Sequence, residues 1–150
     1  MGQSLVKNYI HLIYSTKQRQ PLIHEPIEAK LYNYLGGICR NLECNPVKIG
    51  GYTNHVHILC MLSKKICVMK LLEEVKSHSS KWMKTNGPSF SNFYWQDGYG
   101  AFSVSPSHVD SVKEYIERQA EHHQHKTFQE EFLEFLREYN VEYDERYVWD

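Results

Sequence analysis

Two strand-like segments, joined by a two-residue turn and flanked by helical segments, constrain the fold of this chain more than any other feature. The strands are residues 46–52 and 55–62, and Thr53 and Asn54 form the turn between them. Apolar residues recur at helical spacing before this hairpin, over residues 27–41, and after it, over residues 68–84. The hairpin therefore lies between two amphipathic helices.

Two outer strands complete the pattern. Residues 6–15 and 99–105 are rich in β-branched and aromatic residues, which is typical of strands. The order strand, helix, strand, strand, helix, strand predicts an α+β fold of the ferredoxin-like β-α-β-β-α-β type. In this fold two helices back a four-stranded antiparallel sheet.

An extra helix is expected after the last strand. Ser107 is a good N-cap, and Asp110 stands three residues further on, where it can help to satisfy free backbone amides. We expect this helix over about residues 107–125 and an acidic, partly helical tail over about 127–150. No internal repeat or long linker divides the chain, so a single domain over residues 1–150 is expected.

Composition places the chain among ordinary soluble globular proteins. It has 150 residues, of which 41% are hydrophobic and 23% charged, enough for one hydrophobic core. No apolar run approaches the roughly 20 residues that cross a bilayer. The first residues alternate like a strand and lack a signal-peptide cleavage site, so we expect no membrane segment and a cytoplasmic protein.

The four cysteines, Cys39, Cys44, Cys60 and Cys67, contain no Cys-x-x-Cys pair, which disfavours a zinc knuckle. Nothing marks the chain as secreted, so disulfides gain no support either. Reduced, mostly buried thiols are the expected state.

The net charge of −1 conceals an asymmetry between the two halves. Residues 1–86 hold 12 Lys and Arg against 5 Asp and Glu, whereas residues 87–150 hold 5 against 13. A nucleic-acid partner would be attracted to the basic first half. A basic face that docks on an acidic one, within the chain or between subunits, explains the same asymmetry equally well.

The first chemical signal is the pair His55 and His57 in one strand. Residues two apart in a strand point to the same face, so the two imidazoles project side by side while Val56 points into the core. This geometry suits two ligands of one divalent ion. Two histidines with ordinary hydrogen bonds on a half-exposed strand remain the alternative.

The second signal is Tyr115 with Gln119 on the extra helix. Val109, Val112, Ile116 and Ala120 form the apolar stripe of this helix, and Tyr115 and Gln119 lie one turn apart beside it. The tyrosine hydroxyl is a nucleophile once activated, and the glutamine oxygen suits hard ions such as Mg²⁺ or Mn²⁺. The alternative is that Tyr115 packs and Gln119 is a surface residue.

The other tyrosines fit a nucleophile less well. Tyr9 and Tyr14 are expected in the core, and Tyr139, Tyr143 and Tyr147 lie in the acidic end, which is unfavourable for a phosphate.

The joint pattern resembles the single-tyrosine HUH transposases, the enzymes of the smallest bacterial and archaeal insertion sequences (the IS200/IS605 type), which are related to the REP-associated tyrosine transposases. The likeness spans nearly the whole chain. It is carried by Ser15-Thr16-Lys17-Gln18-Arg19, Asn54-His55-Val56-His57, Lys76-Ser77-His78-Ser79-Ser80, Tyr94-Trp95-Gln96-Asp97-Gly98-Tyr99 and Tyr115-Ile116-Glu117-Arg118-Gln119.

The resemblance implies a mechanism and its residues. His55, His57 and Gln119 would bind a divalent ion, Mg²⁺ or Mn²⁺, and Tyr115 would attack the phosphorus of single-stranded DNA. The products would be a 5′-phosphotyrosine link and a free 3′-hydroxyl, which later rejoins strands without a nucleotide cofactor. Family members act as homodimers on DNA with hairpin ends, and the tyrosine helix of one subunit can complete the site of the other. Action at the nucleoid of a prokaryotic cytoplasm would follow.

Several further residues are candidates for supporting roles. His122 falls on the same flank as Tyr115 and Gln119 and would replace Gln119 or support the site. Tyr94 and Trp95 would stack on a base or, as we favour, be buried in the core. Contacts to DNA phosphates are expected from basic residues of the first half, namely Lys17, Arg19, Lys64, Lys65, Lys76, Lys81 and Lys84.

Other functions remain open. A domesticated relative that processes chromosomal repeat hairpins would share the chemistry but not the target. A rolling-circle replication initiator is usually larger. A non-catalytic nucleic-acid-binding module of the same fold would have no need for the histidine pair together with Tyr115. A two-histidine phosphoesterase would need a second His-x-Thr/Ser motif, which we do not find.

Overall fold

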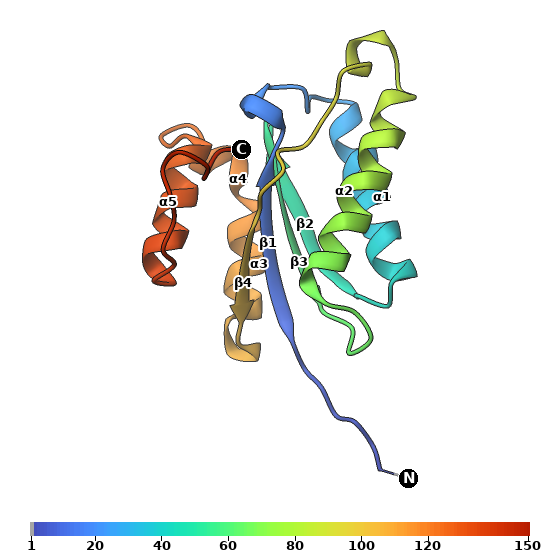
Figure 1. Cartoon of the computed structure of the whole chain (residues 1–150), viewed down its shortest axis with the longest axis vertical. Helices are drawn as coiled ribbons and strands as arrows, with labels where there is room; N and C mark the ends of the chain where they lie inside the picture. Colours follow the sequence, from blue (N-terminus) through green and yellow to red (C-terminus); the bar gives the residue numbers. More distant parts are fainter. Residues whose placement is uncertain (1) are drawn as a thin grey trace.

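A four-stranded antiparallel sheet lies at the centre of the computed structural model, which describes residues 2–150 (Figure 1). The strand order is β2-β3-β1-β4. The elements of the ferredoxin-like unit are β1 (Tyr9–Ser15), α1 (Ile27–Asn41), β2 (Pro46–Tyr52), β3 (His55–Met61), α2 (Val68–Lys84) and β4 (Gly100–Val104). The helices α3 (Val109–Glu117), α4 (Gln119–His122) and α5 (Phe128–Glu138) follow. The α+β fold expected from the sequence is confirmed.

The two faces of the sheet are covered by different parts of the chain (Figure 1). The helices α1 and α2 cover one face, where Val56, Ile58 and Cys60 of β3 join the main core. The other face carries His55, His57 and Leu59 and is covered by α3, α4 and α5. Because side chains alternate along β3, the strand contributes apolar residues to the main core and histidines to the opposite face.

The bounds of the ferredoxin-like elements agree closely with the prediction, but the extra helix does not. Instead of one helix over 107–125, the structure has a 3-10 turn at Pro106–His108, then α3, then α4 after a break at Arg118. Ser107 lies inside the turn and does not cap the helix, because the turn that Pro106 opens delays α3 until Val109. Ala120, expected in the apolar stripe, is exposed.

The helix α3 packs closely on β2. A Cβ atom placed on Gly50 would lie 2.8 Å from Cγ2 of Ile116 and 3.0 Å from its carbonyl oxygen. Glycine at this position therefore lets the helix that carries Tyr115 approach the sheet.

The C-terminal segment packs on the same face as α3. Phe128, Phe132 and Leu136 of α5 form a second buried cluster with Ile13 and Phe102 of the sheet. The end of the chain lies beside the end of β1 and the beginning of β4. There the Arg19 guanidinium donates to the Trp149 carbonyl (2.5 Å), and the Gly98 amide donates to the Asp150 carbonyl (2.9 Å). These contacts fix α5 against the sheet.

The cysteines are free, as expected, and Cys39, Cys44 and Cys60 are buried while Cys67 is exposed. Within residues 2–150, none of the helices combines the length and the hydropathy that a membrane span requires.

Candidate active site

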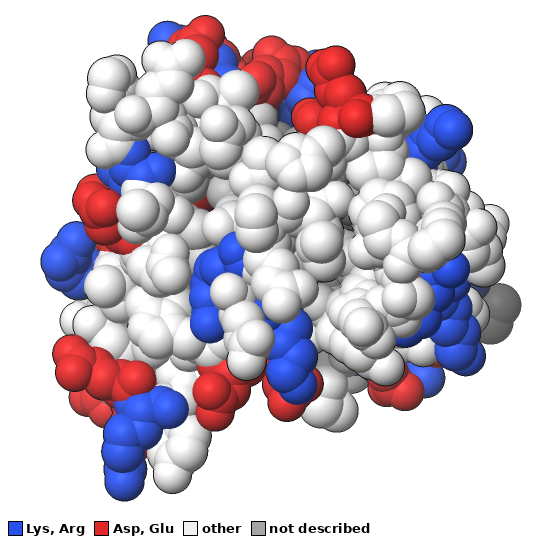
Figure 2. Space-filling view, turned by 90° about the horizontal axis from the view of Figure 1, so that it is seen from above, with Lys and Arg blue, Asp and Glu red and all other residues white. Residues whose placement is uncertain are grey.

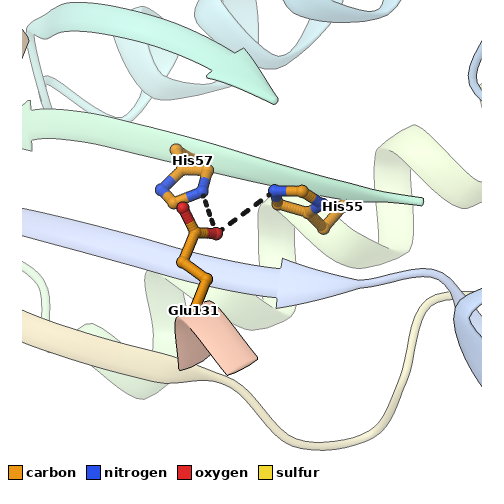
Figure 3. Close-up of side chains that lie close together, drawn as sticks. All are labelled: His55, His57 and Glu131. Atoms are coloured by element: carbon orange, nitrogen blue, oxygen red, sulfur yellow. Dashed lines mark hydrogen bonds and ion pairs between the residues drawn. The ribbon is translucent and has the colours of Figure 1, made fainter. Parts of the chain in front are cut away.

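Two histidines of β3 and one glutamate of α5 meet on the sheet face that the C-terminal helices cover (Figure 3). His55 and His57 project from the same side of β3, as predicted, and both are fully buried. The carboxylate oxygen Oε1 of Glu131 lies 3.4 Å from Nε2 of His55 and 3.1 Å from Nε2 of His57. One ligand atom from each of the three residues lies within 4.8 Å of the others, as at a metal site.

Tyr115 and Gln119 contact the same glutamate. The Tyr115 hydroxyl donates to Oε2 of Glu131, and the Gln119 amide donates to that oxygen over 3.0 Å. The carbonyl oxygen of the Gln119 side chain lies 2.9 Å from Nε2 of His55. The structure thus brings Tyr115, Gln119, His55 and His57 of one chain together, despite the break between α3 and α4.

The ring nitrogens of His55 are arranged like those of a metal-binding histidine. Nδ1 of His55 lies 2.9 Å from the side-chain oxygen of Asn54, which can only accept, so Nδ1 carries the ring proton. Burial lowers the pKa of His55 to about 4, so the ring is neutral near pH 7 and Nε2 presents a lone pair. That lone pair faces the oxygens of Gln119 and Glu131, three acceptors without a proton among them.

His123 repeats this arrangement from the other side. Its Nδ1 donates to the Lys126 carbonyl over 2.7 Å, which leaves Nε2 as the ring nitrogen that faces the cluster. This Nε2 lies 3.1 Å from the Gln119 side-chain oxygen and 3.3 Å from Oε1 of Glu131. Imidazole nitrogens and hard oxygens that converge in this way are the donor set of a divalent ion.

The spacing of these donors also fits a metal ion. The separations between neighbouring donor atoms run from 2.9 to 3.4 Å. Two ligands that flank an ion at right angles with bonds of about 2.1 Å are roughly 3 Å apart. The residues present therefore fit a divalent ion.

A histidine of β1 orients the ring of His57. Nε2 of the buried His11 of β1 lies 2.8 Å from Nδ1 of His57. Burial, followed by the neighbouring His57, lowers the pKa of His11 well below its ordinary value, which keeps His11 neutral. Such a partner fixes the orientation of a metal-binding imidazole.

The Tyr115 side chain is partly buried against Glu131 and also lines a pocket that is open to solvent. Burial and the Glu131 carboxylate raise the pKa of the Tyr115 phenol, so it is protonated at neutral pH. Together with His11, Tyr115 lines a pocket of about 600 Å³ between β4, α3 and α5. A substrate in this pocket would meet the phenol directly.

A second pocket, of about 540 Å³, opens on the His123 side of the cluster. His123 and Asn54 line it, with Arg19 and Lys126 at its wall. The cluster around Glu131 therefore has two pockets beside it, one lined by Tyr115 and the other lined by Arg19 and Lys126.

The predicted DNA-contacting residues fall into three groups. Lys76 and Lys84 serve the fold, since the Lys76 ammonium donates to the Gln96, Asp97 and Gly98 carbonyls and that of Lys84 to the Phe93 carbonyl. Lys64 and Lys65 follow the Met61 end of β3, which lies about 13 Å along the strand from His57 and about 20 Å from His55. Lys17 and Lys81 remain candidates, and so does Arg19, whose guanidinium lines the second pocket in addition to donating to the Trp149 carbonyl.

Lysine and arginine side chains do not form one continuous basic patch on the face of the molecule shown in Figure 2. On the face in Figure 2 they lie in separate groups, with acidic side chains mainly toward the rim and uncharged residues between them. The charge asymmetry of the sequence is met partly within the chain, because Lys48 of the basic half pairs with Glu117 of the acidic half over 3.4 Å.

Three further sequence candidates are resolved by the structure. Trp95 is buried, as favoured, and donates to the Ser79 hydroxyl over 2.9 Å, whereas Tyr94 is 54% exposed. His122 lies outside the ion cluster, but its ring stacks on Tyr115 with 4.4 Å between centroids. His122 thus packs on Tyr115, and its neighbour His123 reaches the cluster.

Sequence reasoning missed Glu131, His123 and His11. Glu131 is flanked by the apolar residues Phe128 and Phe132, which gave the only signal that it faces inward. The acidic composition of its segment gives no indication of a site for phosphate. His11 lies on the same face of its strand as Tyr9 and Ile13. Its spacing of two residues from both is a signal, visible in the sequence, that it faces the same side of the sheet.

Comparisons with known proteins identify a family and a shared fold. The family model described as "Transposase IS200 like" matches residues 4–119. No curated protein matches the chain. Among solved structures, a Deinococcus radiodurans R1 protein described as a transposase is 22% identical, with a TM-score of 0.63 over 79% of this chain and 96% of that one. A REP-associated tyrosine transposase bound to a REP hairpin is 12% identical, with a TM-score of 0.61 over 82% of this chain and 73% of that one.

Proposed function

The chain belongs to the family of IS200-like transposases, and from this membership we propose that it cleaves and rejoins single-stranded DNA through a phosphotyrosine at Tyr115. The observation that carries the proposal is the convergence of Tyr115 and Gln119 with His55 and His57 around one carboxylate in a single chain. A non-catalytic binding module would have no use for a buried donor set beside a held phenol.

We propose that His55, His57 and Gln119 hold a divalent ion, Mg²⁺ or Mn²⁺, as the fit of the donor set supports. When bound there, the ion would polarise the scissile phosphate and stabilise the departing 3′ oxygen. His11 keeps His57 in the orientation that binding requires, and Asn54 does the same for His55.

The chemical step conserves atoms and phosphodiester bonds. The Tyr115 oxygen forms a bond to phosphorus while the bond from phosphorus to the 3′ oxygen breaks. The phenol loses its proton and the departing 3′ oxygen gains one. The 5′ end of the DNA is then linked to Tyr115, and attack by a free 3′-hydroxyl on this link reverses the exchange and rejoins strands without ATP.

The partner is single-stranded DNA with a hairpin near the cleaved site. Family membership supports this proposal, and so does the fold shared with a transposase that is bound to a REP hairpin. We propose that Lys17, Arg19 and Lys81 contact its phosphates, that the active protein is a homodimer, and that it acts at the nucleoid of a prokaryotic cytoplasm. The fold is equally compatible with a domesticated relative that processes chromosomal repeat hairpins.

Covalent labelling tests the proposal. The protein is incubated with Mg²⁺ and labelled single-stranded DNA that carries an end of the element, and the products are separated on a denaturing gel. We expect label on the protein for the wild type and none for Tyr115→Phe, which should still bind the DNA.

Tyr139→Phe is the matched control, because the Tyr139 hydroxyl lines the same pocket but donates to the Ser103 carbonyl (3.1 Å). This variant should label as the wild type does. Labelling of Tyr115→Phe at the wild-type level would overturn the assignment.

A further inference from the structure

Glu131 lies outside the part of the chain that the family shares. The family model ends at residue 119, at the side chain of Gln119, whereas Glu131 stands on α5. It nevertheless has the most contacts in the cluster, since its two oxygens face Tyr115, Gln119 and three imidazoles. A segment beyond the family match therefore reaches the centre of the site.

The fold places this carboxylate firmly. Phe128, Phe132 and Leu136 anchor α5 in a buried cluster on the sheet, so Glu131 is held between two buried rings of its own helix. Its side chain is about 1% exposed. A buried carboxylate is costly unless charge and hydrogen bonds compensate it, so a side chain kept here must have partners that require it.

The two oxygens of Glu131 face different groups. Oε1 faces the nitrogens of His55 (3.4 Å), His57 (3.1 Å) and His123 (3.3 Å), and Oε2 accepts from the Tyr115 hydroxyl and the Gln119 amide. The carboxylate thus connects the ion site with the nucleophile through its two oxygens.

We propose that Glu131 is a ligand of the divalent ion through Oε1 and a positioning residue for Tyr115 through Oε2. This rests on the proposed function for the identity of the site, and it adds a carboxylate from α5 to the ligands His55, His57 and Gln119. The C-terminal helix is then part of the active centre, where it couples ion binding to the placement of the phenol. A hard carboxylate oxygen also favours Mn²⁺ or Mg²⁺ over softer ions.

Binding of Mn²⁺ to the full chain, measured by calorimetry and by the signal of free Mn²⁺ in electron paramagnetic resonance, tests the ligand role without DNA. Loss of groups that only orient metal ligands costs 10- to 100-fold in affinity, so Glu131→Gln should weaken binding by about 100-fold or more. Glu134→Gln is the matched control, because Glu134 lies one turn along the same helix and pairs at the surface with Lys126. It should bind Mn²⁺ as the wild type does.

A second measurement uses the wild type alone and does not depend on the folding of a variant. In protein labelled with ¹³C at glutamate carboxyl groups, electron–nuclear double resonance on bound Mn²⁺ should detect a coupled carboxylate carbon. Absence of this coupling, or wild-type affinity in Glu131→Gln, overturns the ligand role.

The positioning role has its own readout. At Mn²⁺ concentrations that saturate each variant, Glu131→Gln should still form the covalent adduct more slowly than Glu134→Gln, because the carboxylate that holds the phenol is lost. Equal rates at saturation would refute the positioning role.

The outcomes separate this inference from the proposed function. If Mn²⁺ binding depends on Glu131 but the wild type forms no adduct with DNA, the site holds and the transposase chemistry fails. If the wild type forms the adduct at Tyr115 while Mn²⁺ affinity is independent of Glu131, the chemistry holds and the ligand role fails.

Discussion

Substitution of Gly50 by alanine should move the helix that carries the nucleophile. The added Cβ would lie 2.8 Å from Cγ2 of Ile116, whereas carbon atoms in contact are about 3.7 Å apart, so α3 must shift outward by roughly 0.9 Å. Tyr115 is the neighbouring residue on α3. A displacement of about 1 Å at a catalytic group costs on the order of 100-fold in rate, which we expect for adduct formation by Gly50→Ala.

The same substitution should lower stability. Overpacking of a well-filled interface costs about 1 to 3 kcal/mol. For a chain of this size 1 kcal/mol corresponds to about 3 °C, so thermal unfolding should occur roughly 3 to 9 °C lower. Circular dichroism and the covalent-labelling assay measure the two effects on one sample.

Gly37→Ala provides the control. Gly37 lies inside α1, and a Cβ placed there meets no atom within 4 Å. Alanine should stabilise this helix by about 0.5 to 1 kcal/mol and leave the labelling rate unchanged. If Gly50→Ala has the same unfolding temperature and the same labelling rate as the wild type, the close packing of α3 on β2 does not position Tyr115.

Three further predictions follow from contacts around the site. Removal of the ring stacked on Tyr115 by His122→Ala should slow labelling two- to tenfold, since an aromatic pair contributes about 1 kcal/mol, and His122→Phe should restore the rate; equal rates for all three proteins would contradict this role. Lys76→Met should lower the free energy of unfolding by about 1 to 3 kcal/mol, because three hydrogen bonds are lost. Lys17→Ala should leave thermal unfolding unchanged and should weaken DNA binding, with a smaller dependence of the affinity on salt. The reverse pattern would show that Lys76 serves DNA binding and not the fold. Mn²⁺ at about 100 times its dissociation constant should stabilise the fold by about 2.7 kcal/mol, or roughly 8 °C, and EDTA should remove this shift in the unfolding temperature; an unchanged unfolding temperature would mean that the folded chain holds no ion.

The fold was predictable because local patterns determine it. Alternation in β3 assigns Val56 to the core and His55 and His57 to the other face, and the helices of the ferredoxin-like unit end where their apolar spacing ends. The break at Arg118 was not predictable, since the residues on both sides of it continue a helical pattern.

The site was predictable only in part. His55 with His57 and Tyr115 with Gln119 are short-range pairs whose spacing is visible in the sequence. Glu131 reaches the cluster through tertiary packing of α5, and net charge argued against its segment. His123 was hidden among neighbouring histidines, because the break between α3 and α4 decides which of them turns inward.

Mixing two inactive variants tests most directly that one chain brings Tyr115 to its own His55 and His57. Tyr115→Phe keeps the ion ligands and lacks the nucleophile, and His57→Ala keeps the nucleophile and lacks a ligand. After the two folded proteins are mixed, allowed to exchange subunits and given Mg²⁺ and labelled single-stranded DNA, we predict no covalent label beyond that of the separate samples. Label that reappears on mixing would contradict the single-chain site, because it would mean that the tyrosine of one chain serves the histidines of another.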